Sequence, residues 1–444
     1  MKYRKQEPKL ARPLTGTKSI WHFIKHFLDD IKIDLFHSSI LLSGNIATQL
    51  IAVLAYPVLT RLYSASQFGE FSLFLSITGI LAIISTGRLE YALMLPDKDS
   101  EARNLIKIGI RWCLIFSLAC LIVSLIIGQF GKLTQKIPGL YWIGLYVFLS
   151  GTVQFFTLYR NRLQQYKKLA KVSVLQNTAS SGIKIAFGFT NLISYGLIWG
   201  NIIGQFIATW TITKGYVIQL FKEKPLSVKA TLQKYSAFPR YRMVQAVINS
   251  LSSNLPIFFI TYYFSLKEAG FYALIFGIAM RVIVLISSSL YQVLYQKFSE
   301  LKRKHQPMIK LFIKIIILLL MISFIPGVVI IIFAKPLVSI FFGNGWLEVT
   351  GYMRIMFPWL VMVFVASPFA FIFDVFLLQK KALYFDLIQL FSRILSLYIG
   401  LWFNNVFLAI LLFSLSGVAC QLFLIIWYRI IITKDIPELP GLIN

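Results

Sequence analysis

The amino-acid sequence predicts an all-α integral membrane protein with about 12 transmembrane helices. Of its 444 residues, 57% are hydrophobic and only 14% are charged, and the mean hydropathy is +0.73. A soluble domain carries about 25% charged residues, so most of this chain is expected to face lipid or other helices. Long apolar runs alternate with short basic segments, which favours one membrane unit over several soluble domains.

A membrane-spanning helix needs about 20 mostly apolar residues. Twelve segments meet this requirement: 38–59, 69–90, 108–128, 139–159, 172–190, 192–213, 241–263, 269–291, 311–333, 350–375, 382–403 and 405–428. The fifth and sixth are separated only by Thr190–Asn191, and the last two only by Asn404–Asn405. An even number of spans places both termini on the same side of the membrane.

Lysine and arginine are distributed unevenly between the two sides that these spans define. With the N-terminus in the cytoplasm, 32 of the 44 basic residues lie on cytoplasmic segments and five lie on outer segments. Because cytoplasmic loops are enriched in basic residues, we expect a multi-pass protein of the bacterial inner membrane with both termini cytoplasmic. The same asymmetry accounts for the net charge of +27 without a nucleic-acid partner.

The predicted spans divide the chain into two halves. Residues 1–37 are expected to form a cytoplasmic basic, amphipathic arm, 38–213 and 241–431 two six-helix bundles, 214–240 a cytoplasmic linker and 432–444 a cytoplasmic tail. The segment YSASQFGEFSL at 63–73 resembles FSLKEAGFYAL at 264–274, which lies 201 positions later. Both segments follow an odd-numbered helix, so the halves are expected to be parallel repeats related by an axis along the membrane normal.

The sequence shows no pattern of catalytic or metal-binding residues. Cys113, Cys120 and Cys420 lie in apolar runs without metal-ligand spacing, and the four histidines lie on predicted cytoplasmic segments. The predicted outer loops are short, which weighs against a membrane glycosyltransferase or ligase with a folded aqueous active site. We therefore expect no catalytic residue, metal or cofactor, and the sequence favours transport over catalysis.

Polar side chains occur at helical spacing in the first and seventh predicted spans, which correspond to each other in the two halves. They are Asn45, Thr48 and Gln49 in the first span, and Gln245, Asn249, Ser252 and Ser253 in the seventh. Such groups are costly in hydrocarbon and are typical of a hydrated cavity. The alternative is that they form hydrogen bonds between helices without contacting a substrate.

Three basic residues lie deep in predicted spans, namely Lys184, Arg281 and Arg393. An unpaired cation at the bilayer centre costs about 3 kcal/mol, so these side chains are predicted to face a hydrated cavity that receives an anionic, phosphate-bearing substrate. Arg88 and Arg354, nearer the ends of their spans, are assigned to the same predicted cationic cavity. The alternative is that a helix C-terminus pairs with one or more of these cations.

Three acidic residues, Glu90, Asp374 and Asp386, lie near the predicted cytoplasmic ends of their spans. One interpretation is that they couple transport to an ion gradient, and the other is an ion cluster at the membrane surface with Lys380 and Lys381. An antiporter for cationic drugs is expected to carry acids deep in its bundles. The deep charges here are positive, which favours an anionic substrate.

Two stretches of the chain resemble a known transporter family. TRLYSASQFGEFSL, followed by RLEYALMLPD, is similar to the N-terminal region of Wzx-type polysaccharide flippases of the multidrug/oligosaccharidyl-lipid/polysaccharide (MOP) exporter superfamily. INSLSSNLPIFFITYYFSLKEAGFYAL, followed later by FFGNGW, looks like their second half. The resemblance covers residues 38–431 and depends on many weakly specific positions rather than on one signature.

The resemblance implies a MATE-like fold of two bundles around a central cavity that opens to one side at a time. It implies transfer of undecaprenyl-diphosphate-linked oligosaccharide repeat units from the inner to the outer leaflet, as in O-antigen and lipopolysaccharide synthesis. Membrane lipids, a polysaccharide polymerase and chain-length machinery are the implied partners. A cation-coupled multidrug antiporter of the same fold is the alternative. The basic residue followed by proline that many relatives carry has no counterpart in LIFGIAMRVIV, so no binding role is carried over to Arg281.

Overall fold

The computed structural model describes residues 46–129, 139–190, 195–216, 227–376 and 378–434, and within these ranges every regular element is a helix. Nine helices are long and apolar enough to cross a membrane. Ile46–Leu62, α6 (Tyr166–Gly188) and α7 (Gly196–Thr213) bring the set to twelve. The predicted all-α membrane fold is therefore confirmed, while the predicted arm at 1–37 and Asn45 lie outside the described residues.

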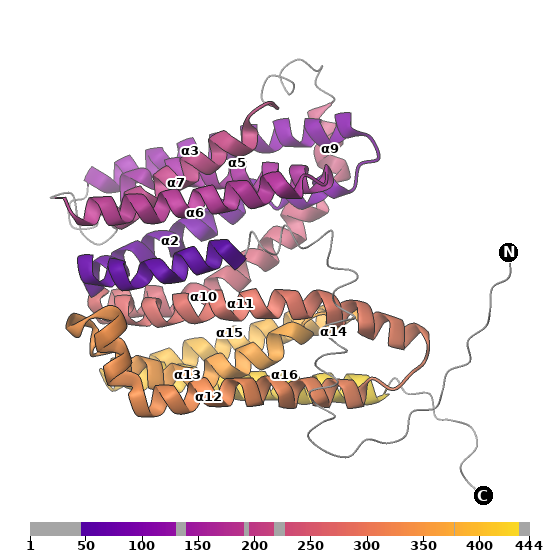
Figure 1. The fold of residues 1–444 in the computed structure, drawn as a ribbon. Helices are drawn as coiled ribbons and strands as arrows, with labels where there is room; N and C mark the ends of the chain where they lie inside the picture. The colour runs from indigo at the N-terminus through magenta and orange to yellow at the C-terminus, as the bar shows by residue number, and fades with distance from the viewer. Residues whose placement is uncertain (1–45, 130–138, 191–194, 217–226, 377, 435–444) are drawn as a thin grey trace, which may run out of the picture.

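The helices form two bundles. The first contains Ile46–Leu62, α2 (Ala65–Thr86), α3 (Asp99–Gln129), α5 (Ile143–Arg162), α6 and α7. The second contains α10 (Met243–Tyr263), α11 (Leu266–Arg303), α12 (Ile309–Phe342), α13 (Val349–Ala366), α15 (Gln379–Trp402) and α16 (Val406–Lys434). In Figure 1, α3, α5, α6 and α7 lie on one side, α12, α13, α15 and α16 lie on the other, and α2, α10 and α11 lie between them.

Short helical segments connect these long helices. They are η1 (Leu89–Met94), η2 (Leu140–Trp142), α9 (Val228–Lys234), η4 (Phe238–Arg242), η5 (Asn344–Trp346), η6 (Ser367–Phe369) and α14 (Ile372–Val375). The predicted tenth span, 350–375, is thus one long helix followed by η6 and α14. Pro368 lies in η6, and a proline removes a backbone donor, which explains why α13 does not continue.

Two helices end at residues other than those predicted from hydropathy. The helix α11 continues to Arg303 instead of ending near residue 291. Its added turns carry charged pairs such as Glu300 with Lys304, whose Oε1 and Nζ lie 2.6 Å apart, so they remain helical outside hydrocarbon. The helix α2 ends at Thr86, because Gly87 adopts a left-handed conformation with φ of 58°.

The two halves begin their second helix in the same way. Ser64 precedes α2 and its Oγ accepts the backbone N–H of Gln67, while Ser265 precedes α11 and its Oγ accepts the N–H of Glu268. These four residues correspond at the shift of 201 positions in the sequence. The repeat predicted from sequence is therefore visible as two equivalent helix starts.

The two repeats also cross each other at equivalent glycines. A Cβ atom on Gly69 would overlap the carbonyl oxygen of Leu266, and a Cβ atom on Gly270 would overlap that of Ala65. Because Ala65 corresponds to Leu266 and Gly69 to Gly270, the two contacts are reciprocal, as a two-fold relation between the halves requires. We call this closed end of the molecule the Gly69 end, and the opposite end, where α2 finishes and α10 starts, the Arg88 end.

The apolar core is continuous between the bundles at the Gly69 end. One cluster of buried residues joins Leu59, Phe68 and Leu73 of the first bundle to Ile260 and Phe271 of the second. Two further clusters lie in the first bundle, and one of them includes Tyr235 at the end of α9. The bundles are therefore held together mainly at one end, which leaves room for a cavity at the other.

Candidate functional site: a basic cavity between the bundles

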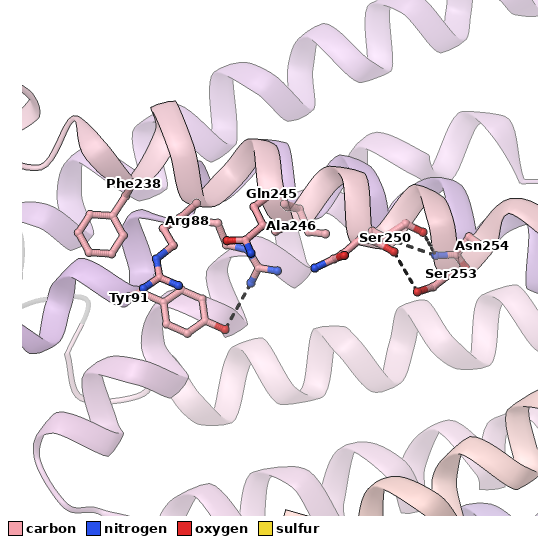
Figure 2. Close-up of a pocket in the computed structure, with 11 residues that line it drawn as sticks. Arg88, Tyr91, Phe238, Gln245, Ala246, Ser250, Ser253 and Asn254 are labelled. Carbon is pink, nitrogen blue, oxygen red and sulfur yellow. Dashed lines mark hydrogen bonds between the residues drawn. The ribbon is translucent and has the colours of Figure 1, made fainter. Parts of the chain in front are cut away.

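A cavity of 680 Å³ lies between the two bundles at the Arg88 end (Figure 2). We call it the inter-bundle cavity, and its lining residues are Ile83, Arg88, Tyr91, Phe238, Arg242, Gln245, Ala246, Asn249, Ser250, Ser253 and Asn254. In Figure 2, Phe238, Arg88 and Tyr91 lie at one end of this row, and Ser253 and Asn254 lie at the other. The lining contains two arginines and no carboxylate, so the cavity is basic.

Arg88 reaches the cavity because the chain turns sharply after α2. Gly87 and Arg88 both have positive φ, of 58° and 57°, so the chain leaves the helix axis before η1 begins. The Arg88 guanidinium lies over the ring of Tyr91, with 5.3 Å between Cζ and the ring centroid. Its Nη1 lies 3.5 Å from Oε1 of Glu90, so this arginine is held by two neighbours in its own turn.

Glu90 is almost completely buried, with 2% of its surface exposed, beneath Arg88. Burial raises the pKa of the Glu90 carboxyl, although the charge of Arg88 acts in the opposite direction. This carboxylate does not line the inter-bundle cavity. It positions Arg88 rather than presenting a negative charge to a ligand.

Arg242 is a cavity residue that the sequence did not identify. It ends η4, a π-helical segment that contains Pro239 and leads directly into α10. The motif FPRYR places this arginine at the start of the predicted seventh span, where a basic residue is typical of the membrane surface. Arg242 could have been identified from its position three residues before Gln245, which places it on the same helix face as the polar stripe of α10.

The polar stripe of α10 faces the cavity. The predicted residues Gln245, Asn249 and Ser253 all line it, together with Ser250 and Asn254. Ser252, which lies on another face of α10, is instead buried and accepts a hydrogen bond from Arg393. Amide and hydroxyl groups can both donate and accept hydrogen bonds, so the stripe suits a ligand rich in hydroxyl groups.

Lys184 and Arg281 approach each other from opposite bundles, deeper than the cavity lining. Lys184 Nζ lies 4.6 Å from the ring centroid of Phe71, and Arg281 Nη1 donates to Oε1 of Gln49 at 3.3 Å. Gln49, which was predicted to line the cavity, therefore accepts a hydrogen bond from Arg281 of the other bundle. Thr48, also predicted to line the cavity, is buried.

The other two predicted cations lie elsewhere. Arg393 is buried inside the second bundle, where its Nη1 donates to Ser252 Oγ at 3.0 Å and its Cζ lies 5.4 Å from the ring centroid of Phe413. Arg354 is exposed, and its Nη2 donates to the carbonyl oxygen of Ile331 at 3.0 Å. Neither lines the inter-bundle cavity, and their predicted part in substrate binding stays a prediction.

A second cavity, of 660 Å³, lies inside the second bundle and shares Arg242 and Gln245 with the first. Asp374 and Asp386 both line it, and Asp386 forms a side-chain hydrogen bond with Asn249. Among the described residues, no group of three or more His, Cys, Asp or Glu side chains could hold a metal ion. The predicted acids are thus close to the basic cavity but separated from it by α10.

Comparison with known proteins places this architecture in a family. The family described as "Polysaccharide biosynthesis protein" matches residues 58–351, which is more than half of the chain. The chain belongs to this family. A search of curated protein sequences gives no match.

Solved structures share the fold of this family member at low sequence identity. An inward-facing multidrug resistance MATE transporter of the MOP superfamily is 15% identical, with a TM-score of 0.64 over 89% of this chain and 98% of that one. The lipid II flippase MurJ in an inward closed conformation is 14% identical, with a TM-score of 0.65 over 90% of both chains. A MOP superfamily transporter from Pyrococcus furiosus is 12% identical, with a TM-score of 0.60 over 91% of this chain and 96% of that one.

Together, the family and the fold define the class of this protein. It is a multi-pass membrane protein of the polysaccharide biosynthesis family, and it shares its fold with transporters of the MOP superfamily and with the flippase MurJ. The predicted MATE-like fold is therefore confirmed. What the chain transports is a separate question, which depends on the cavity.

Proposed function

We propose that this protein is a flippase that moves undecaprenyl-diphosphate-linked oligosaccharide repeat units from the inner to the outer leaflet of the bacterial inner membrane. Its family belongs to polysaccharide biosynthesis, and MurJ, which shares its fold, is a flippase for lipid II. The observation that carries the proposal is the lining of the inter-bundle cavity, with Arg88 and Arg242 and no acid. The glycan would belong to a surface polymer such as the O-antigen of lipopolysaccharide.

The two arginines suit a diphosphate. A guanidinium presents planar N–H donors that match phosphate oxygens in pairs, and it stays charged at any physiological pH. Arg88 lies on the first half of the chain and Arg242 at the start of α10, so one ligand held by both would bridge the two bundles. The polar stripe beside them offers hydrogen bonds to sugar hydroxyl groups.

Lys184 and Arg281 extend this basic route toward the middle of the molecule. They belong to different bundles, so an anion between them would be attracted by a cation from each bundle. We propose that the diphosphate passes from the Arg88–Arg242 pair to this deeper pair as the bundles move. The polyprenyl tail would remain in lipid while the glycan crosses the hydrated interior.

The orientation of the protein follows from its charge distribution. The Arg88 end carries the predicted cytoplasmic segments, so we propose that the inter-bundle cavity opens to the cytoplasm and that both termini lie there. The Gly69 end, which is closed by the reciprocal glycine crossing, then faces outward. Rocking of the two bundles would open the Gly69 end and close the Arg88 end in turn.

A cation-coupled multidrug antiporter is the second candidate. The MATE fold and the pair of acids, Asp374 and Asp386, in the second cavity favour it. The acids also allow ion coupling of the flippase itself. Replacing Glu90 by Gln and each aspartate by Asn, and measuring transport with the ion gradient present and collapsed, tests coupling. Coupling requires at least one variant to lose its response to the gradient.

Removal of the protein from its native cell is the direct test of the cargo. Lipid-linked repeat units are expected to accumulate on the cytoplasmic leaflet, where an external glycan-labelling reagent does not reach them. Cationic dye efflux is expected to remain unchanged. Unhindered arrival of the repeat units at the outer leaflet, without a redundant carrier, would contradict the proposal, and loss of dye efflux would favour the antiporter.

A further inference from the structure

At the Gly69 end, the second bundle extends a hook-shaped segment toward the first bundle. The helix α12 has 34 residues, with a kink at Phe333, and its last turn is followed by Gly343 and η5. This hook, which we define as residues 338–346, ends beside the last turn of the helix Ile46–Leu62. It contains the FFGNGW motif, for which the proposed transport cycle so far gives no role.

Arg61 of the first bundle donates hydrogen bonds to the backbone of the hook. Its Nη2 donates to the carbonyl oxygen of Ile340 at 2.6 Å, and its Nη1 donates to that of Phe341 at 3.4 Å. The last carbonyls of a helix lack intrahelical donors and carry partial negative charge, so a guanidinium is a favourable cap. Arg61 therefore caps α12 although it belongs to the other bundle.

Trp346 makes the reverse connection from the hook to the first bundle. Its Nε1 donates to the carbonyl oxygen of Thr60 at 2.8 Å. That oxygen is free to accept because the backbone N–H of Ser64, its expected helical donor, is bonded instead to Oε1 of Gln67. The indole is only 3% exposed, so this hydrogen bond is shielded from water.

The indole also packs at the crossing of the two repeats. Its ring lies edge-on to Phe68 of α2, with centroids 5.0 Å apart, and to Phe271 of α11, with centroids 5.8 Å apart. These phenylalanines directly adjoin Gly69 and Gly270, the reciprocal contact points. Trp346 thus joins both bundles at the point where the Gly69 end is closed.

We propose that the hook is a latch that holds the Gly69 end closed, and that opening this end requires the Arg61 and Trp346 contacts to break. The inference rests on the proposed function only in so far as the Gly69 end must open during transport. The latch consists of two polar connections and one aromatic contact. Loss of any one of them is expected to shift the population toward the open state without unfolding the bundles.

Access to a single cysteine behind the crossing tests the latch. Gly277 lies about two turns beyond Gly270 along α11, and a Cβ there meets only the hydroxyl of Tyr56, at 3.1 Å. In a protein with Cys113, Cys120 and Cys420 replaced, Gly277→Cys is labelled with a membrane-impermeant maleimide added at the Gly69 end. The labelling rate reports how often that end opens.

Two variants weaken the latch while conserving most of its packing. Trp346→Phe removes the donor to Thr60 and keeps an aromatic ring, and Arg61→Gln removes the charged cap. A net hydrogen bond is worth a factor of about five in an equilibrium, so each variant is expected to raise the labelling rate about fivefold. A cysteine at Ser253, labelled from the Arg88 end, is expected to react more slowly in the same variants.

Lys267→Gln is the matched control. Lys267 pairs with Glu348 at 2.7 Å near the hook, but both residues belong to the second bundle, so its loss is expected to leave the labelling rate unchanged. An unchanged or slower rate at Gly277→Cys in both latch variants, with the proteins shown to be folded by size exclusion, overturns the latch. The labelling requires no substrate, so a wrong cargo would leave this result intact.

Discussion

Arg88 and Arg242 show how two residues of the same type reach one cavity by different local structures. Arg88 follows a left-handed glycine at the end of α2, and Arg242 ends a π-helical segment before α10. Irregular backbone of this kind is frequent at functional sites, because it aims side chains where a regular helix would not. Both arginines line one cavity because the end of α2 and the start of α10 meet at the Arg88 end.

Replacing either arginine is expected to slow transport strongly. A hydrogen bond to a charged group contributes about 1.5–3 kcal/mol, so Arg88→Gln and Arg242→Gln should each reduce transport about 10- to 100-fold. Arg240→Gln is the matched control, because Arg240 lies in the same segment η4 but does not line the cavity. Initial rates of lipid-linked oligosaccharide transfer in proteoliposomes measure the effect. Equal losses in all three variants would contradict a specific role for the cavity arginines.

Glu90 gives a prediction about pH. Burial raises the pKa of its carboxyl in the folded protein. At pH values between the unfolded-state pKa and the folded-state pKa, Glu90 is therefore protonated in the folded protein and ionised in the unfolded chain. Stability from this group is therefore present at low pH and lost as pH rises through that window. Glu90→Gln removes the ionisation, so the melting temperature of the variant relative to the unchanged protein should rise with pH from about 4.5 upward. A difference that is constant with pH would show that Glu90 titrates normally.

At the scale of helices, the reciprocal glycine crossing determines how closely α2 and α11 can approach. Each glycine faces a backbone carbonyl of the opposite helix, and backbone cannot move aside as a side chain can. The sequence showed the repeat that contains these glycines, but it did not show that the two copies contact each other. A repeat predicts equivalent structure, whereas contact between its copies depends on the packing of the whole chain.

Adding a methyl group at the crossing should separate the helices. Gly69→Ala and Gly270→Ala are each expected to destabilise the protein by about 1–3 kcal/mol, and by similar amounts because the contacts are equivalent. Gly79→Ala on the same helix α2 is the control, since a Cβ there has nothing within 4 Å. It should be neutral or stabilise by about 0.5–1 kcal/mol. The midpoint of thermal unfolding in detergent tests all three, and a neutral Gly69→Ala would refute the close crossing.

For the whole molecule, the sequence predicted the helix content, the approximate number of spans and a polysaccharide-related transporter fold, because these depend on apolar run length and on local motifs. The positions of charged side chains within the bundles were harder to predict from the sequence. Periodicity shows which residues share a helix face, but not which neighbouring helix covers that face. Arg393 illustrates the difference: it is buried, but its guanidinium lies over the rings of Trp359 and Phe413 in the second bundle and does not line the inter-bundle cavity.

The same limit explains why the predicted polar stripe of α10 lines the cavity, whereas four of the five predicted cations do not: Lys184, Arg281, Arg354 and Arg393. Several neighbouring turns of α10 carry polar side chains, so Gln245, Asn249 and Ser253 define one continuous face. A single arginine on an otherwise apolar helix, such as Arg354, carries no such pattern. Clusters of residues are therefore more informative than isolated charges when only the sequence is known.

The central claim is that a basic cavity between two bundles carries a diphosphate-linked glycan. The most direct measurement compares, in proteoliposomes containing the purified protein, the transfer rates of two lipids with the same glycan and polyprenyl chain, one with and one without the diphosphate. We predict transfer of the diphosphate lipid alone, and loss of that transfer in the double variant Arg88→Gln, Arg242→Gln. Equal transfer of both lipids, or unchanged transfer by the double variant, would contradict the account.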